Sequence, residues 1–211
     1  MKHGLWSDPA LLRDEEYLQS LQGLAEYEQL LDECQRQSTE AQRTMQPELF
    51  VLQPEQKSTQ PSLFAIALHG NTGNVRSHAQ EWQWLAMKGW RVGLPQSSQL
   101  EAPNAAVWND YERGTREVQS HYSALNEQYE LDSERMIIGG FSAGGGLAIH
   151  LAVTGAIRAR GFVVVGPYLR NPDSLIPLLE TARARRVRGY MVMGLQEPPE
   201  GQELMRNVPV Y

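Results

Sequence analysis

The sequence is poor in cysteine and has no long apolar run, and both shortages exclude whole classes of protein. Cys34 is the only cysteine among 211 residues, so the sequence holds neither a disulfide framework nor a thiolate zinc site. The apolar runs are much shorter than the roughly 18 to 20 residues that span a bilayer. The first residues also lack the continuous apolar segment of a signal peptide. We therefore expect a cytoplasmic protein without a membrane span.

An excess of positive charge is missing as well. The net charge of -6 at pH 7 argues against a nucleic-acid-binding protein. The one basic cluster, RARRVR at 183–188, stands immediately before an apolar run, and we interpret it as a solvated helix end rather than a phosphate-binding patch. With 41% hydrophobic residues, the composition is that of an ordinary globular protein, and the length fits one sizeable domain.

The first 45 residues differ in pattern from the rest of the chain. Apolar residues recur there at steps of three and four, which predicts an amphipathic helix or a helix pair. These residues are Tyr17, Leu18, Leu21, Leu24, Tyr27, Leu30 and Leu31. Asp8 and Pro9 form a start signal, with Asp8 as the cap and Pro9 in the first turn. We expect residues 1–45 to be a helical extension packed on the main body. The alternative is a partner-binding or dimerising element, which leaves a homodimer open.

From Glu48 onward, short apolar runs alternate with helical stretches. The runs lie at 49–54, 63–70, 90–96, 135–140, 161–167 and 189–194, and the helical stretches lie at about 75–88, 110–129, 143–155 and 173–185. Continuous apolar strands that alternate with helices predict an α/β fold over residues 46–211, with a mostly parallel sheet covered by helices on both faces. Such sheets bind ligands at the carboxyl ends of their strands. We therefore expect the site in the segments 69–74, 95–110, 140–145, 166–170 and 194–197.

A serine stands in a glycine-rich junction between a predicted strand and a predicted helix. Residues 140–144, Gly-Phe-Ser-Ala-Gly, fit the G-x-S-x-G pattern of a nucleophile elbow. The chain reverses so sharply at the serine of such an elbow that the residues two positions away must lack side chains, and Gly140 and Gly144 meet this demand. The helix that follows directs its N–H groups and positive dipole end to the same place, which suits an oxyanion. We therefore predict that Ser142 is a catalytic nucleophile.

The alternative is a glycine-rich turn that binds phosphate or only packs tightly. The P-loop motif does not occur in the sequence, and the dinucleotide-binding glycine motif does not occur at this junction. Both absences favour the nucleophile elbow.

A second loop, ALHGNTGN at 67–74, follows an early predicted strand. A loop in this position can offer one backbone N–H to an oxyanion, while the residue after the nucleophile offers another. The expected donors are the amides of Asn71 and Ala143. We expect His69 to bond the loop backbone rather than to act as a catalytic base.

The segments HGNTGN, GLPQSSQ with VWND shortly after it, and GGFSAGGGLA follow one another in an order that resembles one group of α/β-hydrolases. This is the phospholipase/carboxylesterase and dienelactone-hydrolase-like group, and the resemblance covers residues 48–195. It implies a Ser-Asp-His triad, esterase or thioesterase chemistry on a small-molecule ester, and neither cofactor nor metal. It also implies that Trp108, with Gly70 and Phe141, lines the substrate pocket. The alternative for Trp108 is a tryptophan anchored in the core.

The acid of the triad is less clear. In this family the acid follows the sixth or seventh strand, where members often carry Gly-x-x-Asp, and this chain has Gly194 to Glu197 instead. Glutamate can replace aspartate because the acid holds the imidazole tautomer and stabilises imidazolium. Glu197 is therefore the candidate acid, unless it is only an exposed loop charge, and Asp173 is the fallback.

Histidine is missing where the family places the base, after the last strand. None of the five histidines follows Glu197. His150 lies eight residues after Ser142 on the same predicted helix, and about 12 Å along a helix is too far for a hydrogen bond. The closing MRNVPVY resembles the opening of a final strand, and only nine residues, 198–206, separate Glu197 from Asn207. A parallel crossover needs at least about 10 to 12 residues. We therefore expect the natural protein to contain residues that this sequence lacks, the catalytic histidine among them.

Three functions follow from these patterns. In the first, the protein is a serine esterase, Ser142 attacks an acyl carbonyl, and a histidine outside this sequence takes the proton. In the second, the protein is a hydrolase-like binder without activity, because loss of the triad base costs on the order of 10⁴ to 10⁶ in kcat. In the third, the glycine-rich turn binds a phosphate or a nucleotide.

Overall fold

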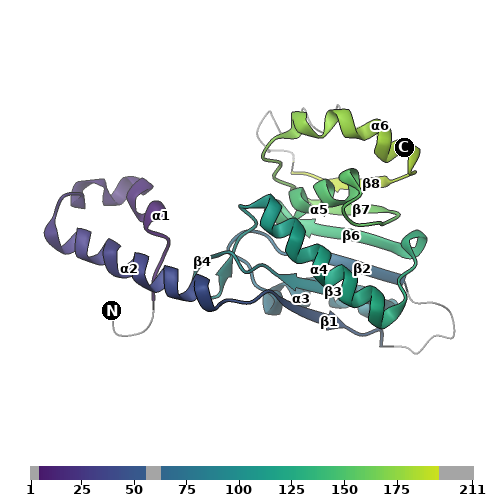
Figure 1. Ribbon diagram of the computed structural model, residues 1–211, viewed down its shortest axis with the longest axis horizontal. Helices are drawn as coiled ribbons and strands as arrows, with labels where there is room; N and C mark the ends of the chain where they lie inside the picture. The colour runs from purple at the N-terminus through teal and green to yellow at the C-terminus, as the bar shows by residue number, and fades with distance from the viewer. Residues whose placement is uncertain (1–4, 56–62, 195–211) are drawn as a thin grey trace.

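The computed structural model describes residues 5–55 and 63–194, which form a helical arm and an α/β body (Figure 1). The elements of the arm are α1 (Pro9–Asp14), the 3₁₀ helix η1 (Glu16–Leu21) and α2 (Ala25–Thr44). Asp8 caps α1 by accepting a hydrogen bond from the Ala10 N–H, and Pro9 lies in the first turn. The predicted start signal is therefore confirmed.

The arm has a small core of its own, in which Tyr27, Leu31 and Cys34 of α2 are buried. The Tyr27 hydroxyl donates a 2.7 Å hydrogen bond to the carbonyl oxygen of Leu12 and ties α2 to α1. Tyr17 is 86% exposed. Gly23, with φ +86°, lies between η1 and α2 and separates the two helices. The structure therefore contains the helix pair that the periodicity allowed, rather than one long helix.

The arm projects from the body and meets it at the C-terminal end of α2, beside β4 (Figure 1). The Gln42 side chain donates to the Ser98 carbonyl oxygen and accepts from the Leu100 N–H. The Asp8 N–H donates to the Glu101 carbonyl oxygen at 2.9 Å. Both ends of the arm are thus bonded to the segment that follows β3.

The main sheet of the body has six strands in the order β1-β3-β2-β6-β7-β8. They are β1 (Glu48–Leu52), β2 (Leu63–Leu68), β3 (Trp90–Gln96), β6 (Met136–Phe141), β7 (Gly161–Val165) and β8 (Arg188–Val192). All neighbouring strands are parallel except β1, which runs antiparallel to β3 at the edge. The predicted α/β fold with a mostly parallel sheet is confirmed.

Helices cover both faces of the sheet, as predicted. They are α3 (Val75–Met87), α4 (Tyr111–Tyr129), α5 (Ser142–Thr154) and α6 (Ile176–Ala184). Successive side chains of a strand point to opposite faces, so Phe64, Ile66 and Leu68 join a core with residues of α4, α5 and α6. Ala65 and Ala67 join a smaller core with α3. Among the described helices, α3 alone packs on this second face.

The structure adds short elements that the sequence patterns did not predict. They are the strands β4 (Leu100–Ala102) and β5 (Ala105–Ala106), which pair with each other, and the 3₁₀ helices η2 (Ser133–Arg135) and η3 (Pro172–Ser174). Each is too short to show a period of its own. Across residues 5–55 and 63–194, no helix combines the length and the apolarity that a membrane crossing needs.

The basic cluster at 183–188 is more than the solvated helix end that we expected. The Arg185 guanidinium donates to the carbonyl oxygens of Ala152 and Val153 near the C-terminus of α5. A cation at this end of a helix satisfies free carbonyl groups and complements the helix dipole. At least one arginine of the cluster therefore has a structural role.

Candidate active site

Ser142 lies at an abrupt change from strand to helix. β6 ends at Phe141, and α5 begins at the next residue. Ser142 has φ +51°, in the left-handed region that residues other than glycine rarely adopt. Such a conformation costs about 1–3 kcal/mol and is concentrated at functional sites. No hydrogen bond joins the Ser142 hydroxyl to any residue that the structure describes, so the oxygen is not occupied by a structural contact.

The two glycines of the pentapeptide are sterically required. A Cβ on Gly140 would lie 2.6 Å from the backbone of Gly144. A Cβ on Gly144 would lie 2.2 Å from the carbonyl oxygen of His69 and 2.5 Å from that of Leu68. No real side chain fits at these distances, so the steric demand that the motif predicts is present at both positions.

The loop after β2 lies against this turn because β2 and β6 are paired along their length. A Cβ on Gly70 would approach the Phe141 ring to 2.8 Å and the Ser142 Cβ to 3.5 Å. The next residue is Asn71. Among the described contacts, neither the Asn71 N–H nor the Ala143 N–H donates a hydrogen bond. Two uncommitted backbone donors are therefore close to the serine.

The loop that carries Asn71 is fixed from several sides. The Asn71 side chain accepts a 2.9 Å hydrogen bond from the backbone N–H of Trp108 and donates a 3.0 Å hydrogen bond to the Asn109 side chain. The Gly73 N–H donates to the Gly70 carbonyl oxygen at 3.1 Å and closes the turn. Asn74 caps α3 by accepting from two N–H groups of its first turn. A donor held in this way needs little reorganisation during a reaction.

No family model and no curated protein matches the sequence, whereas many solved structures match the fold. An uncharacterized protein from Bacillus cereus ATCC 10987 matches 98% of this chain with a TM-score of 0.65 and 27% identity. This chain spans 66% of the length of that protein, just under two thirds. A monoacylglycerol lipase of Paleococcus ferrophilus matches 79% of this chain and 86% of its own, with a TM-score of 0.54 and 16% identity. Esterase PE8 matches 78% of this chain and 99% of its own, with a TM-score of 0.52 and 13% identity.

The fold is that of the α/β-hydrolases. In this α/β-hydrolase fold, Ser142 follows one central strand and Asn71 follows its neighbour, at the carboxyl ends where open parallel sheets bind ligands. The lipase and the esterase share too little sequence with this chain to show more than the fold.

His69 supports the loop, as predicted from the sequence. Its side chain is 1% exposed. Nδ1 lies 2.7 Å from the Gly70 carbonyl oxygen, and Nε2 accepts a 3.3 Å hydrogen bond from the Ser97 N–H. Nδ1 therefore carries the proton. Burial lowers the pKa of His69 to about 4. Both ring nitrogens of this neutral histidine are engaged, and the expectation that it bonds loop backbone is confirmed.

Acid should destabilise the protein through His69. The pKa of His69 is about 4 in the folded protein and returns to about 6.5 in the unfolded chain. Between these values the unfolded state binds more protons, so this stability is complete above about pH 6.5 and is lost as the pH falls toward 4. The full loss is about 3 kcal/mol. Urea denaturation at pH 7 and pH 4.5 should show a smaller pH effect in His69→Gln than in the wild type. An equal pH effect in both proteins would refute this role.

The other described histidines do not contact Ser142. His78 on α3 is buried, with Nδ1 2.9 Å from a carboxylate oxygen of Glu81. His150 on α5 packs against the ring of Tyr111, with 5.6 Å between the ring centroids. Burial lowers the pKa of His78, of His121 and of His150. Within residues 5–55 and 63–194, no histidine is placed to take a proton from the serine.

The two candidate acids differ in what the structure shows of them. Glu197 lies outside the described residues. Asp173 lies in η3 and is exposed. None of the described contacts joins Asp173 to a histidine, and its role as the fallback acid stays a prediction.

The predicted pocket residues fall into two groups. Phe141 is 52% exposed, and its ring lies over Gly70. Trp108 is 1% exposed, and its indole N–H donates a 2.9 Å hydrogen bond to the His69 carbonyl oxygen. Its contacts are those of a tryptophan anchored in the core, which was the alternative interpretation. Phe141 and Gly70 therefore lie at the surface of the site, and Trp108 lies beneath it.

Tyr168 is a residue of the site that the sequence patterns did not single out. Its N–H donates to the Ser142 carbonyl oxygen at 2.9 Å, and its side chain is 60% exposed. Its carbonyl oxygen accepts a 3.3 Å hydrogen bond from the Tyr111 hydroxyl. The signal available in the sequence was position alone, because segment 166–170 follows β7 at the carboxyl edge. Tyr168 thus flanks the serine opposite the Asn71 loop.

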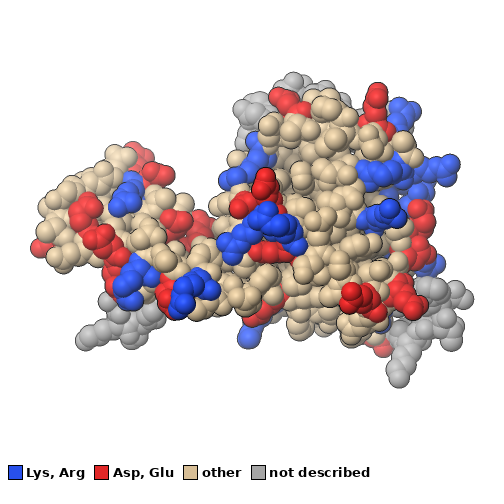
Figure 2. Space-filling model, in the orientation of Figure 1, with Lys and Arg blue, Asp and Glu red and all other residues tan. Residues whose placement is uncertain are grey.

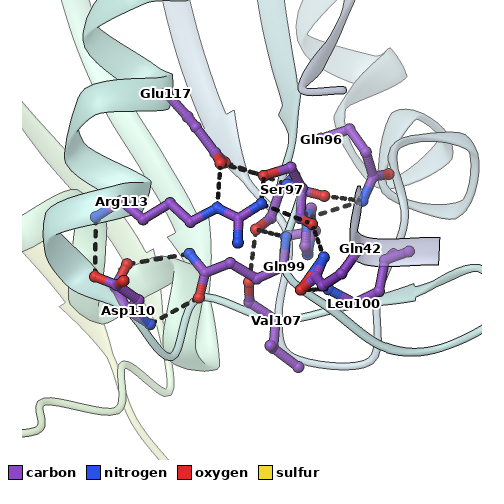
Figure 3. Close-up of polar contacts among 11 residues, drawn as sticks. Gln42, Gln96, Ser97, Gln99, Leu100, Val107, Asp110, Arg113 and Glu117 are labelled. Carbon is purple, nitrogen blue, oxygen red and sulfur yellow. Dashed lines mark hydrogen bonds and ion pairs between the residues drawn. The ribbon is translucent and has the colours of Figure 1, made fainter. Parts of the chain in front are cut away.

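A buried polar network supports the segment between β3 and α4 (Figure 3). Glu117 of α4 is 9% exposed and accepts hydrogen bonds from the Ser98 hydroxyl and from the Arg113 guanidinium. Gln99 donates to the Asp110 carbonyl oxygen and accepts from the Asp110 N–H. A carboxylate buried in this way needs such partners. The network fixes the residues that precede α4, which include Asn109, the partner of Asn71.

Proposed function

We propose that this protein is a serine hydrolase that cleaves carboxylic ester or thioester bonds, and that it is a member of the phospholipase/carboxylesterase group. The observation that carries the proposal is the placement of Ser142. Ser142 has a strained left-handed backbone conformation between β6 and α5. Beside it lie the backbone N–H groups of Asn71 and Ala143, which donate no hydrogen bond among the described contacts. Backbone strain and preorganised donors at one half-buried serine suit acyl transfer.

The reaction proceeds through an acyl-enzyme. The Ser142 oxygen attacks the carbonyl carbon while a general base takes its proton, and the Asn71 and Ala143 amides stabilise the oxyanion. The carbon–oxygen or carbon–sulfur bond to the leaving group then breaks, and the protonated base returns the proton to the alcohol or thiol. Water, activated by the same base, attacks the acyl-enzyme and releases the acid and free Ser142. No cofactor or metal takes part in these steps.

The base in this proposal is a histidine outside the described residues, and Glu197, also outside them, is the acid that orients it. This assignment follows from the contacts of His69, His78 and His150, which are all directed to other groups. The role of the acid is to hold the imidazole tautomer and to stabilise the imidazolium that forms.

The test is covalent labelling of the full-length protein with a fluorophosphonate probe, together with hydrolysis of p-nitrophenyl acetate. We expect rapid stoichiometric labelling, with the probe found by mass spectrometry on the peptide that carries Ser142, and turnover of the ester. Prior labelling should remove the turnover. Label on another serine would contradict the nucleophile assignment, and absence of both labelling and turnover would favour a hydrolase-like binding protein.

A further inference from the structure

A cleft of about 570 Å³ lies between the arm and the body. Asp8 and Gln42 of the arm line it, together with Asn109, Asp110 and Tyr111 before and at the start of α4, and Arg170 after β7. Its volume is in the range of small-molecule sites.

Two chains of contacts join the cleft to the serine. Asn109 holds the side chain of Asn71. The Tyr111 hydroxyl donates to the Tyr168 carbonyl oxygen, and the Tyr168 N–H donates to the Ser142 carbonyl oxygen. The Tyr111 hydroxyl also lies against the first turn of α5, because a Cβ on Gly146 would come within 2.6 Å of it. Residues that line the cleft therefore contact both segments that flank Ser142.

Some polar groups of the cleft already form hydrogen bonds within the protein, whereas others form none with a described residue. The Gln42 side chain donates a hydrogen bond to the Ser98 carbonyl oxygen and accepts one from the Leu100 N–H (Figure 3). The guanidinium of Arg170 makes no hydrogen bond or ion pair with a described residue. The side-chain N–H₂ of Asn109 is likewise without an acceptor among them.

Acceptors are available beside these donors. Asp110 uses one carboxylate oxygen to cap α4, where it accepts from the Arg113 N–H. Asp8 uses one carboxylate oxygen to cap α1. In each side chain the second oxygen remains for a ligand. Donors and acceptors are thus interleaved around one cavity.

The charges of the cleft point to a neutral ligand. Asp8, Asp110 and Glu112 repel an anion, whereas Arg170 and Arg113, which is also paired with Glu117, repel a cation. Figure 2 shows basic and acidic side chains side by side over the start of α4, with no field of a single sign there. A hydroxyl group both donates and accepts hydrogen bonds, so it matches interleaved carboxylates, an amide and a guanidinium. The ring of Tyr111 adds a flat apolar surface.

We propose that this cleft binds the alcohol part of the substrate and that this part is a neutral, hydroxyl-rich group, a sugar or another polyol. That the bound group is a leaving alcohol rests on the proposed ester hydrolysis at Ser142. Arg170 and the second carboxylate oxygen of Asp110 form hydrogen bonds with its hydroxyl groups. Asp8, at the start of the arm, contacts the same ligand. The arm is then one wall of the substrate site.

Binding is tested without turnover, by a chemical-shift titration of the ¹⁵N-labelled protein with methyl β-glucoside. We expect saturable shifts and a dissociation constant that rises roughly tenfold in Arg170→Ala, the effect of losing one charged hydrogen bond. The matched control is Arg158→Ala, an exposed arginine before β7 at the opposite edge of the sheet, which should bind as the wild type does. No saturable binding, equal binding by Arg170→Ala, or tighter binding of glucose 6-phosphate would each overturn the proposal.

Kinetics separates this inference from the proposed function. Of two acetate esters, 6-O-acetylglucose should have the higher kcat/KM and cyclohexyl acetate, with an apolar alcohol of similar size, the lower. Arg170→Ala should lower this ratio roughly tenfold. Sugar binding without hydrolysis of any ester would leave the cleft assignment standing and refute the proposed function. Hydrolysis of both esters with equal kcat/KM, without sugar binding, would refute the cleft assignment alone.

Discussion

Replacing Ser142 by alanine should lower kcat for p-nitrophenyl acetate by on the order of 10⁴- to 10⁶-fold in the full-length protein. The attacking oxygen is removed, while the oxyanion donors at Asn71 and Ala143 stay in place. Folding should be almost unaffected, because the Ser142 hydroxyl makes no hydrogen bond with a described residue. Steady-state kinetics gives kcat, and thermal unfolding followed by circular dichroism checks the fold.

The control for this substitution is Ser120→Ala, which removes an exposed hydroxyl on α4 and should retain wild-type activity. A Ser142→Ala protein that keeps more than about a tenth of the activity would refute the nucleophile assignment, since a lost nucleophile costs several orders of magnitude. If Ser120→Ala lost activity to the same extent, the effect could not be assigned to the elbow.

The sequence predicted best what depends on neighbours along the chain. The run at 63–70 became β2 at Leu63–Leu68, and the helix at 143–155 became α5 at Ser142–Thr154. A strand covered on both faces is continuously apolar, so its pattern is visible without its partners. The requirement for glycine at positions 140 and 144 was predictable for the same reason, because both positions lie within the five-residue motif.

Contacts between distant segments were not predictable in this way. Gln42 bonds the Ser98 carbonyl oxygen across 56 positions of the chain, and a glutamine on a polar helix face carries no sign of such a partner. Glu117 resembles a solvated helix charge in the sequence, but the structure buries it against Ser98 and Arg113. The sequence also did not decide whether Trp108 lines the pocket or lies in the core, because burial depends on the residues that pack around a side chain. The direction of β1 depends on its pairing with β3, which its own residues do not encode.

Replacing Gly144 by alanine should both destabilise the protein and reduce its activity. The new Cβ would lie 2.2 Å from the His69 carbonyl oxygen and 2.5 Å from that of Leu68. Both are backbone atoms at the end of a central strand, so neither can rotate away as a flexible side chain does. Overpacking of this kind costs about 3 kcal/mol, which urea denaturation measures. The loop with Asn71 must shift away from Ser142, and loss of one oxyanion donor lowers kcat by about 10²- to 10³-fold.

Gly145→Ala is the matched control, because it adds the same methyl group one residue further along α5. Its Cβ would meet the Gly140 carbonyl oxygen at 3.2 Å and Pro167 at 3.3 Å, which shifts of a few tenths of an ångström can relieve. Alanine is also favoured over glycine in a helix by about 1 kcal/mol. The stability of Gly145→Ala should therefore stay within about 1 kcal/mol of the wild type. Equal losses in both variants would mean that the glycines serve α5 in general, and only a loss confined to Gly144 supports a close approach between the elbow and the Asn71 loop.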